Sequence, residues 1–88
     1  MEIKKVAMCG TLDSSDVLVT VRPSDEESIS ISSPVASRYE EEMKNVVKKV
    51  LNDMDCHHVS VTLQDSGALD CVIEARVLTA LQRGMENE

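Results

Sequence analysis

Apolar and polar residues alternate along several short stretches of the chain, as they do in strands with one buried face. Residues 17–21 carry β-branched side chains at their odd positions, and residues 28–32 and 58–63 alternate strictly. Residues 3–9 are apolar or basic and contain no breaker, which also favours a strand. Polar turns separate these stretches, and Pro23 lies in one of them because it cannot donate to a sheet ladder. We expect the first three strands to form a meander.

A long amphipathic helix is predicted next, over residues 34–54. Ser33 is a suitable N-cap, and Pro34 fits the first helical position, where its missing N–H is not needed. Seven apolar residues then recur three or four positions apart and form one stripe. They are Ala36, Tyr39, Met43, Val46, Val47, Val50 and Met54.

Residues 69–77 fit two different patterns. Their odd positions are all apolar, as in a strand that faces a core: Leu69, Cys71, Ile73, Ala75 and Val77. A helical stripe also passes through the region: Leu69, Val72, Ile73, Val77, Ala80 and Leu81. We favour a hairpin strand after the turn at residues 64–67, then a short C-terminal helix and a frayed tail from Gly84. The prediction is a single α+β domain over residues 1–88: an antiparallel sheet of about five strands, one long helix packed on it, and a short C-terminal helix.

Charge and size restrict the function. The 88 residues carry a net charge of -7 and only one aromatic residue, Tyr39, so we expect neither nucleic acid nor a membrane as a partner. A domain this short has a thin core, which favours a module acted on by other proteins over an enzyme. The acidity suits a partner with a basic docking surface, or serves solubility alone. We see no export signal or membrane span, and expect a cytoplasmic protein whose three cysteines are free thiols.

Metal and hydrolase sites are disfavoured. Cysteine and histidine ligands are available, but without the spacing of a zinc site. The candidates are Cys9, Cys56, His57, His58 and Cys71. His57 and His58 are expected to point to opposite faces of a strand, and Cys9 and Cys71 to behave as small hydrophobes. The chain has no GxSxG motif, so a Ser-His-Asp hydrolase is disfavoured as well.

Residues 10–16 form a loop whose composition suits a modification site. Gly10 precedes two primary hydroxyls, those of Ser14 and Ser15, between Asp13 and Asp16. Covalent modification by another enzyme needs an exposed hydroxyl on an accessible loop. The same residues equally suit an ordinary polar turn, and from physical chemistry alone the turn is the better interpretation.

The motifs of this chain resemble those of the acyl carrier protein (gamma) subunit of citrate lyase. The resemblance rests on MEIKKVA at residues 1–7, GTLDSSD at residues 10–16 and DSGALDC at residues 65–71, continued by Ala75-Arg76-Val77 and Ala80-Leu81. It covers nearly the whole chain. It implies a carrier without catalytic residues, in which Ser14 holds 2'-(5''-phosphoribosyl)-3'-dephospho-CoA through a phosphodiester.

In such a complex the group on Ser14 ends in a thiol that carries an acetyl group. The family implies that the alpha subunit exchanges this acetyl for citrate and that the beta subunit cleaves the citryl thioester to oxaloacetate. A prosthetic-group transferase is implied as a further partner. This chain has Ser15 where glycine also occurs in the family, which leaves attachment at Ser15 open, and Asp13 where glutamate is frequent.

Three other functions remain open. The carrier subunit of malonate decarboxylase uses the same type of group, although residues 67–70 resemble the citrate enzyme more. A phosphopantetheine carrier modified at Ser66 would be a helical bundle, which the strand patterns of residues 17–21 and 28–32 disfavour. The third is an acidic protein-interaction module without a prosthetic group.

Overall fold

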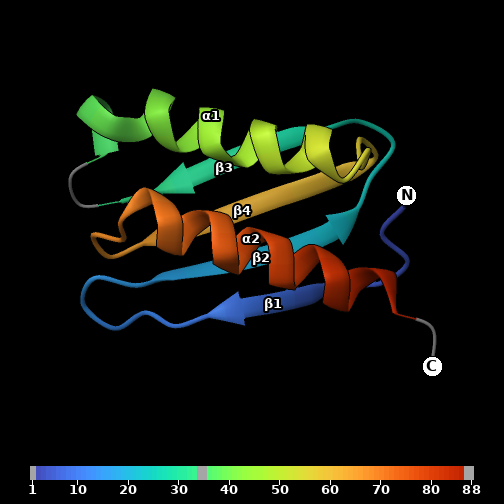
Figure 1. Cartoon of the computed structure of the whole chain (residues 1–88), viewed down its shortest axis with the longest axis horizontal. Helices are drawn as coiled ribbons and strands as arrows, with labels where there is room; N and C mark the ends of the chain where they lie inside the picture. Colours follow the sequence, from blue (N-terminus) through green and yellow to red (C-terminus); the bar gives the residue numbers. More distant parts are fainter. Residues whose placement is uncertain (1, 34–35, 87–88) are drawn as a thin grey trace.

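Four strands and two helices make up the part of the chain that the computed structural model describes, residues 2–33 and 36–86 (Figure 1). They are β1 (Ala7–Gly10), β2 (Val17–Pro23), β3 (Ser28–Ser32), α1 (Ala36–Asp53), β4 (Val59–Asp65) and α2 (Asp70–Met85). The strands form one sheet in the order β1-β2-β4-β3. The predicted α+β class is confirmed, with four strands in place of about five.

Both helices pack on the same face of the sheet, so the domain has two layers (Figure 1). Alternate residues of the two central strands point into the core between the layers: Val17, Val19 and Val21 from β2, and Val59, Val61 and Leu63 from β4. The helices contribute Val47, Leu51, Ile73, Val77 and Leu81, all fully buried. The alternation of residues 28–32 is confirmed, since the serines of β3 are exposed while its isoleucines are partly buried.

The predicted meander is wrong. β1 pairs with β2 and β2 with β4 in antiparallel fashion, but β3 pairs with β4 in parallel and not with β2. The physical reason is the connection: the 18 residues of α1 lie between β3 and β4, and a helical crossover joins parallel strands. The helix itself was predicted within two residues at its start and one at its end. Pro34, the expected first helical residue, lies outside the described residues.

The predicted hairpin strand at residues 69–77 is also wrong, because this segment belongs to α2. The residues that decide between the two patterns are Cys71 and Ala75, which only a strand would bury and which are exposed. The helical stripe is buried instead, through Ile73, Val77, Ala80 and Leu81. At 16 residues this C-terminal helix is not short.

The N-terminal segment and the end of α2 hold each other in place. The backbone N–H of Lys4 donates to the carbonyl of Gly84 at 2.8 Å, and Gly84 is buried beside Ile3. The predicted frayed tail from Gly84 is therefore wrong as far as residue 86. Similarly, residues 3–6 are not part of β1, although Ile3 joins the core.

Neither described helix is long and apolar enough to cross a membrane. The β1–β2 loop and the β4–α2 segment lie together at one end of the domain, on the left in Figure 1, where α1 also begins. The first of these contains Ser14.

Candidate functional site at the Ser14 loop

The β1–β2 loop, residues 11–16, presents Ser14 at the tip of a tight turn. The N–H of Asp16 donates to the carbonyl of Asp13 at 3.1 Å, which places Ser14 and Ser15 at the two central positions. Ser15 has a φ of 66°, a left-handed conformation in which glycine is the least strained residue. Glycine is thus the residue that the backbone at position 15 would accommodate with least strain.

Ser14 is exposed, and its side chain makes no hydrogen bond within the described part of the chain. Ser15 is exposed too, but its backbone N–H donates to the carbonyl of Ser66 at 2.8 Å. A hydroxyl that faces solvent with no internal partner can enter the active site of a modifying enzyme without breaking the fold. The exposure meets the condition that attachment at Ser14 requires, and the attachment stays a prediction.

Hydrogen bonds from the turn that follows β4 hold the loop in place. The N–H of Ser66 donates to the carbonyl of Asp16 at 2.9 Å, and the Ser66 hydroxyl donates to the carbonyl of Leu12 at 3.2 Å. Together with the bond from Ser15, these contacts join two segments about fifty residues apart in sequence. Ser66 is therefore engaged by its backbone and its side chain in holding the Ser14 loop.

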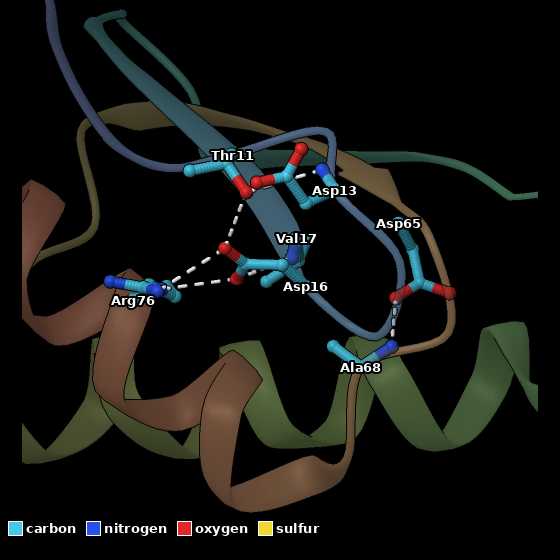
Figure 2. Close-up of polar contacts among 7 residues, drawn as sticks. All are labelled: Thr11, Asp13, Asp16, Val17, Asp65, Ala68 and Arg76. Atoms are coloured by element: carbon cyan, nitrogen blue, oxygen red, sulfur yellow. Dashed lines mark hydrogen bonds and ion pairs between the residues drawn. The ribbon is translucent and has the colours of Figure 1, made fainter.

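Asp16 ties the loop to α2 (Figure 2). Its carboxylate accepts hydrogen bonds from the Thr11 hydroxyl at 2.7 Å and from the Val17 N–H at 2.7 Å. Arg76 adds a two-point contact, with Nε 3.1 Å from Oδ1 and Nη2 3.2 Å from Oδ2. These donors lower the pKa of Asp16 from 3.8 to about 2, with the Thr11 hydroxyl as the largest cause. Asp16 is thus ionised at neutral pH, and its side chain is only 15% exposed.

Asp65 performs a similar structural task in the neighbouring turn. Its Oδ1 accepts from the N–H of Ala68 at 2.9 Å, as Figure 2 shows, and its Oδ2 accepts from the Ser33 hydroxyl at 2.9 Å. This buried carboxylate therefore links the β4–α2 connection to the first residue after β3. Asp16 and Asp65 thus both stabilise turns through their carboxylate oxygens.

The other sequence candidates lie apart from this loop or apart from one another. Cys9 and Cys56 are buried, as small hydrophobes would be, but Cys71 is exposed, so the expectation for Cys71 is wrong. His57 and His58 approach different carboxylates, Glu27 at 3.2 Å and Glu2 at 3.4 Å. Within residues 2–33 and 36–86 no cluster of three or more such side chains is suited to a metal ion.

The role of Arg76 could not be found from the sequence pattern. It lies in one of the segments that carry the family resemblance, which gave a signal that the residue matters, but its partner Asp16 is 60 positions away. Only the packing of α2 across β1 and β2 brings the two side chains together.

Comparison with known proteins identifies the family of this chain. The family model described as malonate decarboxylase delta subunit (MdcD) matches residues 4–84. A citrate lyase acyl carrier protein of Treponema denticola is 41% identical over 86 residues, covering 98% of this chain and 99% of the relative. Another with the same name, from Haemophilus influenzae, is 45% identical over 98% of this chain and 90% of the relative.

A solved structure shares the fold. It is a chain in the crystal structure of a Pseudomonas malonate decarboxylase hetero-tetramer in complex with malonate, with a TM-score of 0.77 at 15% identity. The alignment covers 91% of this chain and 84% of the other. The expectation of a carrier rather than an enzyme agrees with the names of the curated relatives. From the identity to these relatives over nearly its full length, the chain belongs to the family of citrate lyase acyl carrier proteins.

Proposed function

We propose that this chain is the acyl carrier subunit of a citrate lyase and that Ser14 is its point of covalent attachment. The group on Ser14 would be 2'-(5''-phosphoribosyl)-3'-dephospho-CoA, which supplies a terminal thiol for carrying an acyl group as a thioester. The observation that carries the proposal is the exposed, unpartnered hydroxyl of Ser14 on a loop that is otherwise fixed by hydrogen bonds. Such a site combines access for a modifying enzyme with a defined position on the carrier.

The charges around Ser14 are compatible with a phosphodiester. Asp16 is the last residue of the loop. The guanidinium of Arg76 neutralises its charge, and both of its carboxylate oxygens accept hydrogen bonds. Asp13 is exposed to solvent, where water screens its charge. A phosphate on Ser14 would therefore meet no uncompensated carboxylate held inside the fold.

The partners that we propose are the alpha and beta subunits of citrate lyase and a prosthetic-group transferase, in the cytoplasm. A covalent tether makes each encounter between acyl group and subunit intramolecular, with an effective concentration of the order of mM for a flexible arm. The net charge of -7 favours basic docking surfaces on the partner subunits. This chain needs only to dock, to hold the arm at Ser14 and to release it.

The test is peptide mass spectrometry after co-expression with the transferase. Trypsin cleaves poorly between Arg22 and Pro23, so the informative peptide spans residues 6–38. Fragment ions between Ser14 and Ser15 show which serine carries the added mass. We expect the mass on Ser14, its loss in Ser14→Ala and its retention in Ser15→Gly, which also suits the left-handed φ at that position. An unmodified chain would refute the proposal and favour an interaction module.

A second candidate is the carrier subunit of malonate decarboxylase, favoured by the matching family model and by the fold of the solved structure. Reconstitution separates the two. Modified carrier should restore citrate cleavage to citrate lyase alpha and beta subunits and should not restore malonate decarboxylation to the corresponding subunits of that enzyme. The opposite result would transfer the assignment to malonate decarboxylase.

A further inference from the structure

A hollow of about 570 Å³ opens between the first turns of α1 and α2, at the end of the domain that holds the Ser14 loop (Figure 1). Tyr39 and Glu42 line it from α1, residues 67–69 form its floor, and Asp70 lines it from α2. Its volume is in the range of small-molecule sites. Asp16, Ser66 and Arg76, which hold the Ser14 loop, do not line the hollow. Asp65, which holds the neighbouring turn, does.

The hollow lies within a short distance of Ser14. Ser15 is hydrogen-bonded to Ser66, and Ser66 is followed by Gly67, the first residue of the floor. Standard backbone dimensions along this route limit the separation of the Ser14 and Gly67 Cα atoms to about 8 Å. In the proposed group an anionic phosphoribosyl nucleotide lies between Ser14 and the neutral end of the arm. A flexible arm anchored this close to the hollow reaches it with its neutral end by folding back.

The lining selects the chemistry of an occupant. Tyr39 and Leu69 offer apolar surface, with exposed fractions of 48% and 71%. Glu42 and Asp70 offer carboxylate acceptors, and neither is ion-paired within the described part of the chain. Among the side chains that the structure describes, the charged ones that line the hollow are all acidic: Glu42, Asp65 and Asp70. This lining disfavours phosphate and suits a neutral chain with apolar segments and N–H or O–H donors.

We infer that this hollow is a resting site for the neutral, amide-bearing part of the arm on Ser14, the pantetheine portion that leads to the thiol. The inference rests on the proposed function, since it needs the arm at Ser14. In the free carrier the amide and hydroxyl groups of the arm donate to Glu42 and Asp70, and its methylenes pack on Tyr39 and Leu69. Docking to a partner subunit releases the arm.

The experiment compares modified and unmodified protein by NMR, after intact mass has shown that Ser14 is loaded. Signals of residues 66–68 are not diagnostic, because Ser66 contacts the Ser14 loop directly and the next two residues follow it in the chain. The diagnostic signals are the Tyr39 ring and the Glu42 amide, which belong to α1. We expect both to shift on modification. We also expect alkylation of Cys71, an exposed residue of the same wall, to slow at least about threefold, as it must if the arm covers the hollow for two thirds of the time.

Two variants test the assignment without disturbing the core. Leu69→Glu places a charge on the apolar floor, and it should abolish the Tyr39 shift and restore the Cys71 alkylation rate. Val6→Glu makes the same kind of change at another exposed aliphatic residue, 56% exposed and outside the hollow, and should leave both readouts as in the parent protein.

The outcomes separate this inference from the proposed function. A loaded Ser14 with unchanged Tyr39 and Glu42 signals, or shifts confined to residues 11–16 and 66–68, overturns the resting site and leaves the carrier assignment intact. Equal effects of Leu69→Glu and Val6→Glu would also overturn the resting site. A chain that the transferase leaves unloaded overturns both.

Discussion

Gly10 has a backbone conformation and a neighbour that together exclude a side chain. Its φ is 106°, and a Cβ built on it would lie 1.8 Å from the carbonyl oxygen of Val17. Gly67 also has a positive φ, 96°, but a Cβ there would meet nothing within 4 Å. The two glycines therefore form a matched pair. Gly67→Ala introduces backbone strain alone, whereas Gly10→Ala adds a collision with the first residue of β2.

The expected loss in the free energy of unfolding follows from the backbone strain and, at Gly10, from the collision. Placing an L-residue in a left-handed conformation costs about 1–2 kcal/mol, which is the loss expected for Gly67→Ala. At Gly10 the backbone of β2 must also move, because an oxygen at 1.8 Å cannot be accommodated by a side-chain rotation. We expect a total loss of about 3–5 kcal/mol for Gly10→Ala. A chain of this length has a total stability of about 4–13 kcal/mol, so this is a large part of it.

Urea unfolding followed by circular dichroism measures both losses in the unmodified protein. With an m-value near the lower end for small domains, about 1 kcal/mol/M, Gly67→Ala should lower the midpoint by about 1–2 M. Gly10→Ala should lower it by about 3 M or more, or leave the chain unfolded in buffer. The m-value should be unchanged in any variant that still folds, because the surface exposed on unfolding is the same.

The reasoning is refuted if the two variants have the same midpoint. That result would mean that the approach of Gly10 to Val17 does not constrain the β1–β2 loop. A functional measurement accompanies it: the transferase should load Gly67→Ala at the parental rate and Gly10→Ala more slowly, since only the latter displaces the segment that leads to Ser14.

Three further predictions concern the same end of the domain. Ser14→Ala should change the free energy of unfolding by no more than about 0.5 kcal/mol in urea unfolding, since the hydroxyl is exposed and unpartnered, and a larger loss would show a structural role. The pKa of Asp16 is lowered in the folded state from 3.8 to about 2, so its contribution to stability is fully present above about pH 4 and is lost as the pH falls toward 2. Arg76→Met should raise that pKa and move the acid-unfolding midpoint, followed by circular dichroism, to higher pH; an unchanged midpoint would show that Arg76 does not stabilise the carboxylate. In the unmodified folded protein an alkylating reagent should label Cys71 before Cys56, as followed by mass spectrometry. Burial raises the pKa of the Cys56 thiol and removes it from solvent, whereas Cys71 is exposed. Labelling of both cysteines at the same rate would contradict this.

Local patterns predicted most elements of the fold but not their pairing. The alternation of β3 and the helical stripe of α1 were readable because each depends on which residues face the core within one element. The partner of β3 was missed, although the length of α1 between β3 and β4 favours a parallel crossover over a meander. Connection length was the signal that could have corrected the topology.

The segment at residues 69–77 shows where periodicity fails. Its apolar residues satisfy periods of 2 and 3.6 at once over this length, so the local pattern does not choose between strand and helix. The choice is made by burial of Ala80 and Leu81, which continue the helical stripe beyond the ambiguous residues. An assignment over the full 16 residues would have favoured the helix, whereas the prediction divided the segment at Val77.

For the candidate site, the sequence likewise predicted the local feature and missed the long-range contacts. The Ser14 loop was found from its composition and from the family resemblance, and its exposure follows from a turn at the edge of a sheet. The contacts that hold it were not predictable, because they run from Asp16 to Arg76 and from Ser15 to Ser66 across more than fifty residues. Such contacts depend on the sheet order, which the predicted meander missed, and on the placement of α2, whose first half was predicted as a strand.

These long-range contacts bear on how a modifying enzyme would recognise the site. The loop's own internal bonds, Asp16 to Asp13 and Thr11 to Asp16, can form in a short peptide, but the bonds to Ser66 and Arg76 cannot. A peptide of the loop would therefore keep the modifiable hydroxyl and lose its fixed position, and ordering a turn costs about 1–2 kcal/mol per residue in backbone entropy. In the folded domain the loop is already ordered, so binding to the enzyme does not include this loss of backbone entropy. Under the proposed function, the fold would contribute the prior ordering of one exposed serine, through the same contacts that hold β1, β2 and α2 together.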